Sequence, residues 1–192
     1  MLMKRILGLT IAFILLIGMT GIGTWAYFSD VETSTGNVLA AGTLDLKTDD
    51  VDGVSQTLLA MNMEPGDTVG PETIILKNIG SVGGSSLDLA FTYVESDSSS
   101  NPLNKSADDT AAVIEVITLN YDGFSLLGSV SDNNTNGYTD VEDLKNADLS
   151  GQSGINASAT KNFEIAVKLK DSADKDFQAD GINLTMTFIL NQ

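Results

Sequence analysis

Alternation of apolar and polar residues runs through much of the chain and predicts β-strands with one buried face. The clearest pattern lies in residues 163–169 (FEIAVKL) and 182–190 (INLTMTFIL), and residues 87–93 (LDLAFTY) repeat it. Apolar residues are more nearly continuous in residues 113–119 and 124–130, which favours strands covered on both sides. Including these two, further strands are expected at residues 44–46, 55–61, 74–79, 113–119 and 124–130.

Turn-forming residues separate the expected strands. Pro65-Gly66-Asp67 and Gly83-Gly84 are typical of turns, and the Ser-, Asn- and Asp-rich residues 95–109 predict a long surface loop. The pattern gives about seven to nine strands with at most one short helix and no internal repeat. An all-β fold, an antiparallel two-sheet sandwich, is the simplest architecture for such a chain.

The first 26 residues have the order of a cleavable signal helix. Lys4 and Arg5 precede an apolar run over residues 6–22, and Thr24 and Ala26 place small residues at a signal-peptidase site. Cleavage after Ala26 would leave Tyr27 as the new N-terminus. The alternative is a retained membrane anchor, because the run approaches the ~17-residue minimum for a membrane span.

The remainder divides into a polar segment, residues 27–41, and a β domain, residues 42–192. With 192 residues and 42% hydrophobic side chains, the chain is long enough for one domain with a proper core. It has 10 Lys and Arg against 26 Asp and Glu, and loss of Lys4 and Arg5 with the signal leaves 8 against 26, a net charge of −18. Such a surface repels nucleic acid and attracts divalent cations or basic partners, although solubility or a salty habitat explains it equally well.

The absence of His and Cys restricts the chemistry. Catalysis by Ser–His or Cys–His pairs and zinc binding by His are excluded, as is the H-E-x-x-H motif of zinc peptidases. An exported chain without Cys also has no disulfides, so the sheets and a bound metal are the expected sources of stability.

Residues 132–143 (DNNTNGYTDVED) fit a twelve-residue calcium loop. Gly137 supplies the sharp reversal at position six, and the residues that follow the loop are expected to form a short helix. An Asn-, Asp- and Gly-rich turn without metal is the alternative. The predicted ligands of a structural calcium ion are Asp132, Asn134, Asn136, the carbonyl of Tyr138, Asp140 and Asp143.

Four Asn-x-Ser/Thr sequons give candidate glycosylation sites. Asn104, Asn133 and Asn156 lie in predicted loops, where a glycan is easily carried, and Asn183 lies on the polar face of the last strand. Chance occurrence in a chain rich in Ser, Thr and Asn is the alternative explanation.

Several motifs, in order, resemble the camelysin/TasA family of secreted biofilm-matrix fibre proteins, whose fold archaeal bundling-pilus subunits share. They are WAYFSD, AAGTLDL, MEPGDTVGPETIILKNIGS, FEIAVKLKD and GINLTMTFILN. The resemblance implies a jelly roll and polymerisation by donor-strand complementation, in which the N-terminal segment of one subunit completes a sheet of its neighbour. It also brings the metalloprotease label of the camelysin members, which the missing His does not support.

The favoured function is therefore an exported subunit that forms extracellular fibres or pili at the cell surface. Its expected partners are copies of itself, accessory matrix or capping subunits, and signal peptidase during export. Alternatives are a calcium-dependent adhesive or carbohydrate-binding module and a secreted peptidase, and the N-terminal strand could instead fold back into its own domain. The residues expected to anchor the donor strand are Tyr27, Phe28, Val31, Val38 and Leu39.

Overall fold

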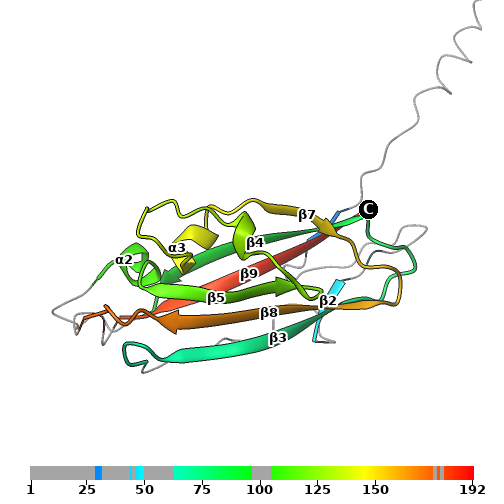
Figure 1. Ribbon diagram of the computed structural model, residues 1–192. Coiled ribbons are helices and arrows are strands. Elements are labelled where there is room, and N and C mark those ends of the chain that lie inside the picture. The colour runs from blue at the N-terminus through cyan, green and yellow to red at the C-terminus, as the bar shows by residue number, and fades with distance from the viewer. Residues whose placement is uncertain are drawn as a thin grey trace, which may run out of the picture.

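The computed structural model describes residues 29–31, 44, 46–49, 63–96, 105–174, 177 and 180–192. These residues form two antiparallel sheets with a few short helices at one side (Figure 1). The strands are β1 (Ser29–Val31), β2 (Leu46–Thr48), β3 (Thr68–Asn78), β4 (Ser86–Glu95), β5 (Ile114–Tyr121), β6 (Phe124–Ser125), β7 (Leu149–Ser153), β8 (Thr160–Leu169) and β9 (Ile182–Asn191). The helices are α2 (Ala107–Ala111), the 3-10 turn η1 (Leu127–Ser129) and α3 (Val141–Leu144).

The sheets have the strand orders β1-β9-β4-β7 and β2-β3-β8-β5-β6. With β2 set aside, eight of the described strands remain, and the first lies beside the last. Of these eight, strands that follow one another in sequence lie in different sheets, except β5 and β6. This is the strand order of a jelly roll. The expected all-β sandwich is confirmed.

The core lies between the sheets and is built by the predicted alternation. Phe163 on β8 is fully buried, and its ring lies 6.3 Å from that of Phe91 on β4 and 5.2 Å from that of Phe188 on β9. These aromatic contacts join the two sheets near their centre. The same faces supply Leu87, Leu89, Ile165, Val167, Met186 and Leu190.

Four expectations about local structure are wrong. The segment 124–130 forms only the two-residue β6 and then η1, because its buried residues Leu126 and Val130 are four positions apart and do not alternate. The loop expected to reach residue 109 ends earlier, since Ser106 and Asp109 form a capping box that starts α2. The chain therefore has more than one short helix. Strand β3 begins at Thr68, well before the expected residue 74.

Several expectations lie outside the described residues: the signal helix, the cleavage site at Ala26 and Tyr27, and the strand at residues 55–61. No helix in the described part of the chain is long and apolar enough to span a membrane.

Candidate metal site

The loop 132–143 leads directly into α3, and the end of the loop builds the start of that helix. Asp140 is the N-cap: its carboxylate accepts hydrogen bonds from the backbone N–H groups of Glu142 and Asp143. The Asp143 carboxylate accepts in return from the N–H of Asp140 at 3.2 Å. The loop is also held to β5, where the N–H of Val116 donates to the carbonyl of Thr139 at 2.8 Å. Helix capping therefore fixes the two carboxylates side by side.

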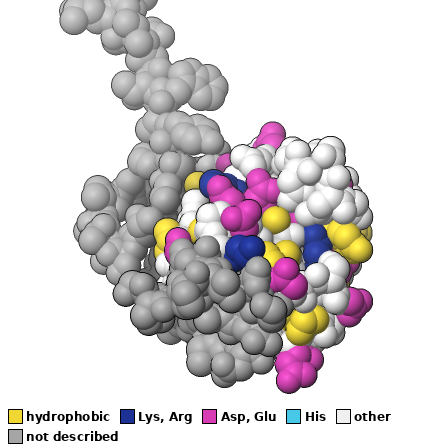
Figure 2. All heavy atoms as spheres, turned by 90° about the vertical axis from the view of Figure 1, so that its left-hand side faces the viewer, with side chains coloured by type: hydrophobic (Ala, Val, Ile, Leu, Met, Phe, Trp, Pro, Cys, Tyr) yellow, Lys and Arg dark blue, Asp and Glu magenta, His cyan; other side chains and the backbone are white. Residues whose placement is uncertain are grey.

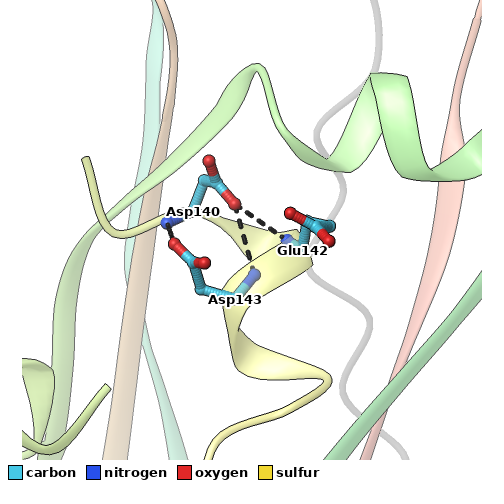
Figure 3. Close-up of side chains that lie close together, drawn as sticks. All are labelled: Asp140, Glu142 and Asp143. Carbon is cyan, nitrogen blue, oxygen red and sulfur yellow. Dashed lines mark hydrogen bonds between the residues drawn. The ribbon is translucent and has the colours of Figure 1, made fainter. Parts of the chain in front are cut away.

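Three carboxylates gather at this point (Figure 3). One oxygen from each of Asp140, Glu142 and Asp143 lies within 4.8 Å of the others. Asp140 and Asp143 are fully buried, and Glu142 is half-buried. We call these three residues the acidic cluster. A metal ion could bind here, because close carboxylate oxygens are suitable ligands for a hard cation.

The cluster includes two of the predicted ligands, and two others contact it. The side-chain amide of Asn134 donates to Asp140 and Glu142 at 3.2 and 2.6 Å. That of Asn136 donates to Asp140 Oδ2 at 2.6 Å. Rotation of either amide by half a turn would direct its oxygen at the cluster, but it would break the hydrogen bond that this oxygen now accepts from the N–H of Asn136 or of Tyr138.

The remaining predicted ligands, Asp132 and Tyr138, are not part of the acidic cluster. Asp132 is exposed, and its two oxygens accept from the N–H groups of Asn136 and Gly137 at 3.1 and 2.9 Å, which shapes the turn. Gly137 has a φ of 86°, the left-handed conformation expected of the loop glycine. The ring of Tyr138 covers the ammonium of Lys170 at 4.4 Å.

Lys170 belongs to the candidate site, and the sequence pattern did not indicate it. Its ammonium Nζ lies 3.4 Å from Asp140 Oδ2, with side chains 7% and 0% exposed, and donates to the carbonyl of Ala112 at 2.6 Å. Lys170 follows β8 and is distant from the loop in sequence. Glu142 was missed as well, because the twelve-residue pattern assigns no ligand to that position.

The chemistry of the donor set fits a hard divalent cation. The acidic cluster offers carboxylates, the two Asn side chains would add amide oxygens only after rotation, and the chain has no His or Cys to supply the nitrogen or sulfur ligands typical of zinc. The cluster has three carboxylates, and the ammonium of Lys170 contacts only that of Asp140, so a cation could pair with the other two.

A neighbouring network attaches α2 and α3 to β4. The hydroxyl of Tyr93 donates to Asp108 at 2.6 Å, and Lys145 contacts the same carboxylate at 3.3 Å. Burial, and next the bond to Asp108, raise the pKa of Tyr93; the bonds from Tyr93 and Lys145 lower the pKa of Asp108. Both shifts keep Tyr93 as the donor and Asp108 as the acceptor at neutral pH.

The other predicted sites are only partly described. Val31 lies in β1, whereas Tyr27, Phe28, Val38 and Leu39 lie outside the described residues. Of the sequons, Asn133 and Asn156 are exposed in loops, as expected, and Asn104 lies outside the described part.

Comparison with protein families matches the chain to camelysin metallo-endopeptidase over residues 2–192. The chain therefore belongs to the camelysin family, which includes TasA-like proteins. No curated protein gives a significant match to the sequence. The family name describes a peptidase, and this chain carries no His from which a zinc-peptidase motif could be built.

Proposed function

We propose that this chain is an exported structural subunit that polymerises into extracellular fibres by donating its N-terminal strand to a neighbouring copy. The observation that carries the proposal is the difference in pairing between the two edges of β9. Its pairing with β4 is complete, from Ile182 opposite Glu95 to Asn191 opposite Ser86. On its other edge, among the described residues, only residues 189–191 have a partner, the short β1.

Within the described part of the chain, residues 182–188 of β9 have no partner on this edge, and their backbone groups could bind another strand. Side-chain burial falls along the same stretch. Phe188 and Met186 are buried, whereas Leu184 and Ile182 pack against the core but are only half-buried. A strand added along this edge would complete both the hydrogen bonds and the apolar packing.

Strand β1 occupies one end of that edge within its own chain, with Ser29 opposite Asn191 and Val31 opposite Ile189. This is the arrangement of the fold-back alternative. The same contacts are available to residues 29–31 of another copy, because exchange of an identical element between subunits preserves the interactions and joins the chains. Repeated exchange in one direction produces a linear fibre.

We propose a structural role and not a peptidase activity. The supporting observation is that the acidic cluster is held by helix capping and by Lys170, and that the chain lacks His and Cys. Digestion of casein by the purified protein with added zinc or calcium would contradict this part of the proposal.

The fibre proposal is tested with the mature chain, residues 27–192, at neutral pH. We expect filaments in negative-stain electron micrographs, with processing after Ala26 found by N-terminal sequencing of exported protein. A protein that stays monomeric, and binds a surface or carbohydrate only with calcium, would favour the adhesive module.

Calcium is the ion we propose for the acidic cluster, in a stabilising role. Saturating calcium is expected to raise the thermal unfolding midpoint, since ligand at a hundred times its Kd adds about 2.7 kcal/mol to the free energy of unfolding. The shift should be lost in a Glu142→Gln/Asp143→Asn variant, which keeps side-chain size and removes two carboxylates of the acidic cluster. It should persist in a Glu72→Gln/Asp171→Asn control, which removes the same charge from exposed positions outside the loop. Equal shifts in the two variants would place calcium elsewhere.

A further inference from the structure

The Lys170–Asp140 ion pair differs in its burial from three other ion pairs of the protein. Figure 2 shows acidic side chains spread over the described surface at one end of the sandwich. Lys170 Nζ and Asp140 Oδ2 instead meet below the surface at 3.4 Å, with side chains 7% and 0% exposed. The acidic partners of Lys145, Lys161 and Lys168 are all at least 44% exposed. An amine and a carboxyl held together away from water are the two groups that form an amide when one water molecule is lost.

The Asp140 carboxyl has hydrogen-bond donors on both of its oxygens. Oδ1 accepts from the backbone N–H groups of Glu142 and Asp143 at 3.1 and 3.3 Å (Figure 3). Two N–H groups that converge on one oxygen stabilise the negative charge that develops there during acyl transfer. Oδ2 faces Lys170 and accepts from the side-chain amide of Asn136 at 2.6 Å. Oδ1 is therefore placed to become the amide oxygen, and Oδ2 is placed to leave.

Lys170 is held in place for such a reaction. Its Nζ donates to the carbonyl of Ala112 at 2.6 Å and lies 4.4 Å from the centre of the Tyr138 ring. These contacts fix the nitrogen beside Asp140, and two reacting groups held in contact react much faster than free ones. Condensation also removes two buried charges, whose separation from water is costly. The surroundings therefore favour the amide both in rate and at equilibrium.

We propose that Lys170 and Asp140 form an intramolecular isopeptide bond in the folded protein. One proton moves from Nζ to Oδ2, and the lone pair of the nitrogen then attacks Cγ of Asp140. A second proton passes from the nitrogen to Oδ2, carried by the Glu142 carboxylate, one oxygen of which lies within 4.8 Å of an Asp140 oxygen. The Cγ–Oδ2 bond breaks, Oδ2 leaves as water with both protons, and the amide keeps one N–H. No oxidant or other reactant is required.

The bond would join the loop 132–143 covalently to the chain that follows β8. It would close a loop of about 30 residues and restrict the unfolded chain as a disulfide does. The chain has no Cys with which to form a disulfide. The carboxylates of Glu142 and Asp143 stay free for a cation, so the bond is compatible with the calcium proposal. The inference is independent of polymerisation, because none of these residues belongs to β1 or β9.

The test is mass spectrometry of the purified protein, shown to be folded by circular dichroism and then denatured, with its N-terminus determined by sequencing. We expect a mass lower than that of the sequence by one water molecule. After proteolysis, the peptide that contains Asp140 and the peptide that contains Lys170 should remain joined, which distinguishes the bond from loss of water within one segment. A folded wild type with the full mass and two separate peptides would overturn the inference and leave polymerisation and calcium binding to their own tests.

Lys170→Arg is the matched variant, because it keeps a positive charge beside Asp140 but cannot form this amide. Its mass should be that of its sequence, whereas the Lys168→Arg control should still lack one water molecule. In denaturant, Lys170→Arg is expected to unfold at a lower concentration than the wild type, and Lys168→Arg at the same concentration. If Lys170→Arg does not fold, the joined peptide of the wild type remains the deciding measurement. Joined peptides in Lys170→Arg would assign the bond to another residue and overturn the inference.

Discussion

A mature chain that lacks residues 27–39 is expected to form no filaments while remaining a soluble, folded β sandwich. Of the described residues, the deletion removes only β1, which contributes three residue pairs to β9. The pairing of β4 with β9 and the contacts of Phe163 with both sheets remain. The proposed donor is lost, whereas the proposed acceptor edge of β9 is retained.

Filaments would be scored by electron microscopy and the fold by circular dichroism. A synthetic peptide of residues 27–39, added in excess to the mature wild-type chain, should cap growing fibres because it offers the strand without the domain that continues the polymer. Phe28→Asp should weaken both the peptide and the fibre, since an unpaired carboxylate is costly to bury. Normal assembly of the shortened chain, or its unfolding, would show that the segment belongs to its own sheet.

The sequence predicted the fold class because apolar and polar residues alternate along the strands that build the core. Residues 163–169 and 182–190 alternate, and both lie in long strands at the centre of their sheets. Their partners were not predicted. Pairs such as Leu89 with Phe188 join residues far apart in sequence, and periodicity carries no information about which strands become neighbours.

Strand β7 was missed for a physical reason. Its sequence, LSGQS, has one buried residue, Leu149, and its pairing with β4 makes it an edge strand whose other residues are half-buried or exposed. A strand held by backbone hydrogen bonds leaves no apolar pattern. The polar segment 149–153 could be assigned only from its partner.

The candidate site was predicted where its residues are consecutive. The spacing of Asp140 and Asp143 gives both a calcium loop and a capping box, and the structure brings their carboxylates together. Lys170 could not be predicted, because its contact with Asp140 depends on how β8 ends beside the loop. The calcium pattern describes ligands and omits the residue that balances their charge.

Lys170→Met is expected to lower the free energy of unfolding by about 3–5 kcal/mol, the usual result of removing one partner from a buried ion pair. The change leaves the buried Asp140 carboxylate without its cation and removes the donor to the carbonyl of Ala112. Denaturant unfolding in the presence of a chelator would measure the loss. Lys168→Met is the control: its partner Asp171 is exposed, so the expected loss is much smaller.

Two further measurements test whether the loss of stability comes from the unpaired charge of Asp140 and whether calcium can replace the missing ammonium. Asp140→Asn combined with Lys170→Met removes the unpaired charge and should recover part of the stability, because a neutral amide is less costly to bury than a carboxylate. Calcium should stabilise Lys170→Met more than the wild type, since the ion replaces the missing positive charge beside Asp140. An equal effect of calcium on both proteins would show that the ion does not bind at the acidic cluster. A loss of stability in Lys170→Met no larger than that in Lys168→Met would show that the buried ion pair contributes little to the stability of the fold.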